Sequence, residues 1–224
     1  MRFELIIGCC LALFSINAIA DSHERPQQAV VLDENLWVTF YDLPSRRFRA
    51  IRTAVLTRDK AAASADLAVA ANYLSVEAER ASDNFQGPLQ QIADQLRAMG
   101  ASVDDVTLQQ LDVIFGRTHW LLAQHYLEFA RRARDVRQNR NTSLYLWATI
   151  HHMERALLWS NVPVTRRVQN TFEDLREIAT DLRDPQTAES AYKEKPVIRA
   201  ETLLRQIGDQ IDRRVLLPAA ASSE

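Results

Sequence analysis

Apolar residues recur at intervals of three and four along most of the chain, from residue 48 to residue 215. Residues with this spacing line one side of an α-helix, whereas a half-buried strand alternates at every second position. The pattern runs through 48–55, 67–81, 89–96, 111–133, 144–160, 168–182 and 204–215. The sequence therefore predicts an all-α fold of about seven helices, in an antiparallel helical bundle or in stacked helical hairpins.

The segments on either side of these helices differ in character and set the domain organisation. Residues 36–41 are a β-branched and aromatic run, which favours a short extended N-terminal segment, either packed on the body or paired as a strand. We expect an extended lead-in over 21–43 and a single helical domain over 44–217, interrupted by a polar linker at 184–197. The small polar residues of 218–224 indicate a frayed tail.

Residues 144–160 are apolar on most sides of the expected helix. Such a helix is normally enclosed by its neighbours, so we predict that it lies at the centre of the fold. The preceding run 141–143 (Asn-Thr-Ser) has residue types that cap a helix start. Gly87 with Pro88 predicts another helix start, and Gly116 predicts a kink or a tight contact within the long helix.

The first segment, 1–20, has the features of a secretory signal peptide. Its apolar core, 5–16, is too short to span a bilayer, which needs about 20 residues. Ala18 and Ala20 supply the small side chains that signal peptidase requires, so the mature chain would begin at Asp21. The sequence thus predicts export to the periplasm through a cleaved N-terminal signal.

Two other interpretations of the leader remain open. The run 6–9 (Ile-Ile-Gly-Cys) has the residue types of a lipoprotein signal, with Cys9 as the lipid-carrying residue, and the leader could also stay as an uncleaved anchor. Cys9 and Cys10 are the only cysteines and both lie in this leader. A cleaved mature chain would therefore have no disulfide, no thiolate metal site and no covalent haem attachment.

Composition excludes several function classes. The glycines are few and widely separated, which excludes the clustered glycines of nucleotide-binding loops. The formal net charge of −2 gives no general attraction to nucleic acid. Neither a Gly-x-Ser-x-Gly nor a His-Glu-x-x-His motif occurs, so we predict no catalytic residues and no cofactor.

Two histidine-containing segments echo each other and carry a metal-site hypothesis. His125 precedes Glu128 by three residues, as His151 precedes Glu154, so each pair projects from one side of its helix. If the helices are antiparallel neighbours, these four side chains could converge on zinc, iron or copper. The alternative is a hydrogen-bonded core histidine at 125, with the glutamates paired to Arg155, Arg131 or solvent. Because His151 lies at the edge of its apolar stripe, we expect the two rings not to converge.

Arginines gather in two places and carry a second hypothesis. The first group flanks the apolar stripe of the first helix, and the second crowds the end of the long helix. The groups are Arg46, Arg47, Arg49 and Arg52, and then Arg131, Arg132, Arg134 and Arg137. Cations at a helix C-terminus complement the helix dipole, whereas a short basic amphipathic helix can contact an acidic partner or an anionic membrane surface.

Together these features predict a non-enzymatic helical module of the periplasm that binds or assists a periplasmic or envelope protein. The alternative is a periplasmic metal- or small-ligand-binding protein that uses His125 and His151.

Overall fold

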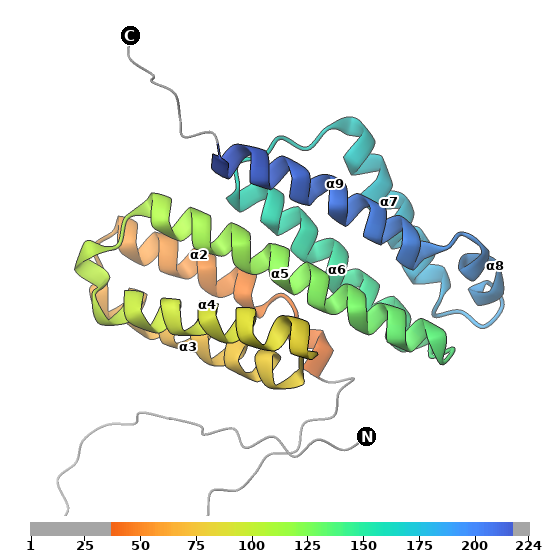
Figure 1. Cartoon of the computed structure of the whole chain (residues 1–224), viewed down its shortest axis with the longest axis horizontal. Helices are drawn as coiled ribbons and strands as arrows, with labels where there is room; N and C mark the ends of the chain where they lie inside the picture. Colours follow the sequence, from red (N-terminus) through yellow and green to blue (C-terminus); the bar gives the residue numbers. More distant parts are fainter. Residues whose placement is uncertain (1–36, 217–224) are drawn as a thin grey trace, which may run out of the picture.

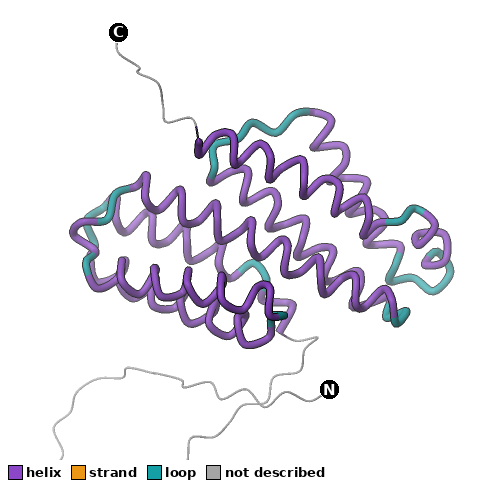
Figure 2. The backbone as a smooth tube through the Cα atoms, in the orientation of Figure 1, coloured by secondary structure: helices purple, strands orange, loops and turns teal. Residues whose placement is uncertain are grey.

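The computed structural model describes residues 37–216, with side chains described as far as Ile211. The predicted signal peptide, Cys9, the lead-in up to residue 36 and the tail at 218–224 lie outside these residues. The described chain forms eight α-helices and two short 3-10 helices, and this part contains no strand (Figure 2). The prediction of an all-α fold is confirmed.

The elements follow one another as η1 (Val38–Phe40), α2 (Leu43–Leu56), α3 (Lys60–Arg80), α4 (Asp83–Ala101), η2 (Val103–Asp105), α5 (Leu108–Asp135), α6 (Asn139–Trp159), α7 (Arg166–Asp181), α8 (Ala188–Lys193) and α9 (Pro196–Leu216).

A long antiparallel hairpin of α5 and α6 runs through the middle of the molecule (Figure 1). On one side α2 and the α3–α4 hairpin pack against it, with α2 in contact with both α3 and α5. On the other side α7 and α9 pack against α6, and α9 also contacts α5. One apolar core extends through both sides. The described helices form a bundle, as predicted (Figure 1).

Side-chain caps fix several helix starts. The hydroxyl of Thr107 accepts a hydrogen bond from the Gln110 amide, and the Gln110 side chain accepts from the Thr107 amide, which forms a capping box at the start of α5. Asp59 at the start of α3 and Thr165 at the start of α7 each accept a single hydrogen bond, from the amides of Ala62 and Val168.

Helix α6 is enclosed, as the sequence predicts. It contacts η1, α5, α7 and α9, and it buries residues around most of its circumference. Ile150 and Met153 have no solvent exposure. The end of α6 also explains Gly116, because a Cβ at Gly116 would lie only 2.6 Å from Oγ of Ser160. Of the two roles predicted for this glycine, the tight contact is observed.

The expectation of an extended segment at 36–41 is wrong for the residues described. Val38–Phe40 form a 3-10 turn in which the Tyr41 amide donates to the Val38 carbonyl at 3.3 Å. Because residues 37–216 contain no strand to pair with, an extended run would leave its backbone groups unpaired there. The turn satisfies one of these groups locally and buries Val38.

Several predicted helix boundaries are also wrong, since the helices begin earlier than their local signals. The run 141–143 lies inside α6, where the Ser143 hydroxyl donates to the Ala179 carbonyl of α7 at 2.5 Å. Gly87 and Pro88 lie inside α4, which starts at Asp83. The linker at 184–197 contains all of α8, and α9 begins at Pro196. Each of these helices therefore starts before the apolar stripe from which it was predicted.

The described helices include none with the length and apolar content that crossing a bilayer requires.

Candidate functional site

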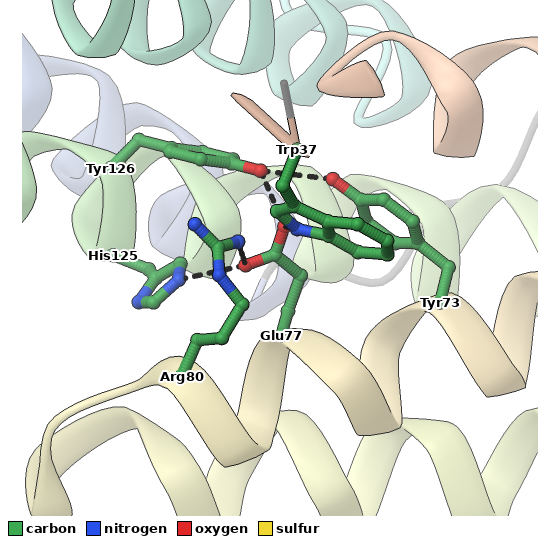
Figure 3. A network of polar contacts seen from close by, with 6 residues as sticks. All are labelled: Trp37, Tyr73, Glu77, Arg80, His125 and Tyr126. Carbon is green, nitrogen blue, oxygen red and sulfur yellow. Dashed lines mark hydrogen bonds and ion pairs between the residues drawn. The ribbon is translucent and has the colours of Figure 1, made fainter. Parts of the chain in front are cut away.

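A buried carboxylate, Glu77 of α3, accepts hydrogen bonds from two other elements (Figure 3). Trp37 Nε1 donates to Oε1 at 2.8 Å, and the hydroxyl of Tyr126 in α5 donates to the same oxygen at 2.5 Å. His125 Nε2 donates to Oε2 at 3.0 Å, and Arg80 forms an ion pair with Oε2 at 2.6 Å. We call these five residues the Glu77 cluster.

The Glu77 carboxylate is ionised at neutral pH. Burial alone would raise its pKa, but the charge of Arg80 and the hydrogen bonds from His125 and Tyr126 outweigh it and lower the pKa to about 2. Burial and the adjacent carboxylate raise the pKa of the Tyr126 phenol well above its ordinary value, so this hydroxyl stays protonated as a donor. The Glu77 cluster therefore holds η1 and α5 against α3.

A second polar cluster, the histidine cluster, consists of Ser45 in α2, His119 in α5, and His151 and His152 in α6. The Ser45 hydroxyl lies 2.7 Å from His151 Nε2 and 3.5 Å from His119 Nε2, the latter at the limit for a hydrogen bond. His119 Nδ1 lies 2.8 Å from His152 Nδ1. These contacts form a chain from the partly exposed His151 to the fully buried His152.

All three rings in this cluster are neutral at pH 7. Burial, with the charge of Arg155 as the next cause, lowers the pKa of His151 to about 4. Burial and the neighbouring rings hold the pKa values of His119 and His152 well below the ordinary range. The facing Nδ1 atoms of His119 and His152 consequently share one proton, since a neutral ring carries one N–H.

Tyr126 joins the two clusters. Its ring stacks on His152 with 5.4 Å between centroids and 11° between planes, while its hydroxyl bonds to Glu77. A seam of buried polar side chains thus runs from Arg80 to His151 through the apolar core.

Neither metal binding nor nucleophilic catalysis fits the histidine cluster. His119 directs one nitrogen to His152 and the other toward Ser45, so the ring nitrogens do not converge on one point. Within residues 37–211 no three His, Cys, Asp or Glu side chains are placed to hold a metal ion. Ser45 and His151 are close enough for a nucleophile and its base, but Ser45 is only 2% exposed and His151 is a weak base.

The four residues of the metal-site hypothesis have four separate environments. His125 bonds to Glu77, and His151 bonds to Ser45. Glu128 accepts from Ser82 at 2.9 Å and pairs with Arg132, while Glu154 pairs with Arg176. The structure does not bring these side chains together as one site, because His125 and His151 turn toward different neighbours.

The eight arginines of the second hypothesis all have partners within the molecule. Seven form ion pairs with carboxylates, and Arg49 donates to the Ser45 carbonyl at 3.2 Å. The pairs are Arg46–Asp42, Arg47–Asp66, Arg52–Asp112, Arg131–Glu201, Arg132–Glu128, Arg134–Asp135 and Arg137–Glu189. These half-exposed ion pairs contribute little stability. They neutralise the arginine charges that would otherwise be available to an acidic binding partner.

Several hollows on the surface of the described residues have the size of binding sites, and two of them lie along α4–α5 and α6–α7. The α4–α5 groove has a volume of about 540 Å³ and is lined by Gln95, Ala98, Met99, Gln109, Gln110, Val113, Ile114 and Arg117. The α6–α7 pocket has a volume of about 650 Å³ and lies where the end of α6 meets the start of α7.

Sequence reasoning missed Glu77, Ser45 and His152 as members of polar clusters. A usable signal existed for the first two, because Glu77 follows Leu74 and Ser45 precedes Phe48 by three residues, on the apolar stripes of their helices. Polar residues on such stripes are buried and need a partner. The identity of that partner depends on the tertiary fold.

The chain matches no protein-family model, no curated protein sequence and no solved structure.

Proposed function

We propose that this chain is an exported, non-enzymatic binding module that accepts an amphipathic helix of an envelope protein in the α4–α5 groove. The observation that carries the proposal is the apolar surface of the groove. Val113 is 54% exposed there, beside the partly exposed Met99 and the exposed Ala98. A groove between two antiparallel helices suits a third helix, which inserts apolar residues at intervals of three and four.

The charge of the groove restricts what can bind. Its rim carries the neutral amides of Gln95, Gln109 and Gln110. The one charged lining residue is Arg117, which is exposed and forms no ion pair with any described residue. A partner helix with a carboxylate beside its apolar stripe would complement this arrangement. The arginines of the earlier hypothesis are less suitable, because each already has an internal partner.

Export is the part of the proposal that rests on the leader at 1–20 and on the cysteine-free remainder. Intact-mass measurement of protein extracted from the envelope tests it, with a mature chain starting at Asp21 expected. A species that retains Cys9 with attached lipid would contradict cleavage at Ala20.

Photo-crosslinking from a defined position tests the groove. A photoreactive residue at Gln109 should capture an envelope protein, whereas the same residue at Ile198 of α9, which is 50% exposed, should not. A synthetic peptide of the captured segment should then bind the purified protein at least tenfold more weakly after Val113→Asp, with Ile198→Asp as the matched control. Equal capture from both positions, or full binding by Val113→Asp, would remove the groove from the proposal.

A further inference from the structure

The α6–α7 pocket combines apolar walls with a small number of charged side chains. Its apolar lining comes from Leu157, Leu158, Val162, Pro163, Val164 and Phe172. Leu158 is 58% exposed and Val164 is 48% exposed, so part of this wall is open to solvent. The volume of about 650 Å³ lies within the usual range of small-molecule sites.

Arg155 is the uncompensated charge of this pocket. It is only partly exposed, its Nε atom is fully buried without an acceptor, and its side chain has no hydrogen bond or ion pair to any residue that the structure describes. The other lining arginine, Arg176, is already paired with Glu154 and lies over the Trp147 ring at 5.9 Å. A guanidinium donates in a planar fork that matches a carboxylate, so Arg155 lacks the partner that its chemistry favours.

No carboxylate among the described residues forms an ion pair or a hydrogen bond with Arg155. The charge of Arg155 acts on the rings of His151, His119 and His152, whose protonation it disfavours. These rings are neutral and therefore cannot balance a cation. Burying an unsatisfied donor is unfavourable, so an arginine kept here without an acceptor needs another explanation.

Charges elsewhere in the pocket favour a ligand with one negative group. The first turns of α7, capped by Thr165, contribute Gln169 and Phe172 to the lining, and the positive end of that helix dipole favours an anion. On the same helix Glu173 is exposed and accepts a hydrogen bond from Gln169 at 3.3 Å. This carboxylate disfavours a second negative charge at the α7 rim.

We infer that the α6–α7 pocket binds a small organic anion, a single carboxylate on an apolar body. Arg155 holds the carboxylate, and Leu157, Leu158 and Phe172 contact the apolar part. This site is separate from the α4–α5 groove and does not depend on the function proposed for it.

Calorimetric titration of the purified chain with octanoate tests the site, with 1-octanol as the uncharged probe of matched length. We expect saturable octanoate binding at least tenfold tighter than that of 1-octanol. Arg155→Met keeps an apolar stem and should weaken octanoate binding at least tenfold, whereas Arg167→Met, an exposed arginine outside the lining, should leave it unchanged.

Two further variants keep the test decisive. Leu158→Glu changes an exposed wall residue and should also weaken octanoate binding, so the pocket is tested even if Arg155→Met lowers the folded fraction. Val113→Asp in the other groove should leave octanoate binding unchanged. The inference is overturned if octanoate does not bind saturably, if 1-octanol binds equally well, or if folded Arg155→Met or Leu158→Glu binds as the wild type does.

Discussion

Glu77 is an ionised carboxylate without access to solvent, and its donors come from Trp37 at the start of η1, from α3 and from α5. A buried ion pair is weak evidence of net stability, because removing both charges from water costs about as much as their attraction returns. The effect of the Glu77 carboxylate on the positions of its neighbours is more direct. The carboxylate determines where Trp37 and Tyr126 lie, and the stacking of Trp37 on Tyr73 at 5.5 Å depends on the same placement.

Replacing Glu77 with Gln should therefore destabilise the fold strongly. The ion pair between Glu77 and Arg80, whose arginine side chain is 6% exposed, would be broken in the protein interior. Breaking a buried pair in this way typically costs about 3–5 kcal/mol. Urea unfolding measures the effect, and Glu79→Gln, at an exposed position on the same helix, serves as the control. A loss below about 1 kcal/mol would mean that the Glu77 cluster tolerates the loss of this ion pair.

At this scale the sequence predicted which kinds of residue are buried better than it predicted their partners. His125 lies on an apolar stripe and is a hydrogen-bonded core histidine, which was the alternative to the metal site. Its acceptor, Glu77, precedes it by 48 residues, and no local pattern connects the two. Periodicity reports the direction of a side chain, whereas the pairing of two side chains requires the packing of α3 against α5.

Among the described elements, α6 is enclosed on several sides, because η1, α5, α7 and α9 pack against it. The apolar stripe of α6 could be predicted from the sequence, because buried positions repeat along a helix with a fixed period. The start of α6 could not be predicted, because Ser143 lies inside the helix and donates a hydrogen bond to the α7 backbone. A contact with another element therefore decides where α6 begins, whereas side-chain caps mark the starts of α3, α5 and α7.

Truncating the buried face of α6 should cost far more than truncating its exposed face. Ile150→Ala and Met153→Ala each remove a side chain with no solvent exposure, and such changes typically cost about 2–5 kcal/mol. Leu158→Ala, on the same helix but 58% exposed, should change the free energy of unfolding by less than about 0.5 kcal/mol. Similar values for all three variants in chemical denaturation would argue against a central α6.

Two helical glycines should respond oppositely to alanine. A Cβ at Gly208 in α9 would lie 2.6 Å from the indole carbon Cζ2 of Trp120. Gly208→Ala should therefore overpack the contact between α5 and α9 and lower the free energy of unfolding by about 1–3 kcal/mol. At Gly100 the nearest atom would be 3.5 Å away, and Gly100→Ala should gain up to about 1 kcal/mol from helix propensity. Thermal unfolding compares them, and Trp120→Leu should relieve the loss at Gly208. A stabilised Gly208→Ala would show that α9 can move away from α5.

Over the whole molecule, the two clusters make the folded state sensitive to acid in two successive pH windows. The histidine pKa values are lower in the folded than in the unfolded chain, so the unfolded chain binds more protons below pH 6.5 and stability falls as the pH decreases. Glu77 affects stability at a lower pH than the histidines do. Its stabilising charge is fully present above the ordinary value of 4.5 and is lost as the pH falls toward about 2.

The free energy of unfolding should therefore decrease steadily from pH 6.5 to pH 4. His151, whose pKa is 6.5 unfolded and about 4 folded, accounts for on the order of 3 kcal/mol of this decrease. Burial is the main cause of this lowered pKa, Arg155, Arg176 and Arg49 reinforce it, and Asp42 opposes it. Urea unfolding at half-unit pH intervals measures the slope, and His151→Gln should reduce it because one of the three titrating rings is gone. Arg155→Met should raise the pKa of His151, which a proton NMR titration follows directly. Stability that stays constant between pH 7 and pH 5 would mean that the three rings take up protons without unfolding the chain, and that the histidine cluster can open to water while the helices around it remain packed.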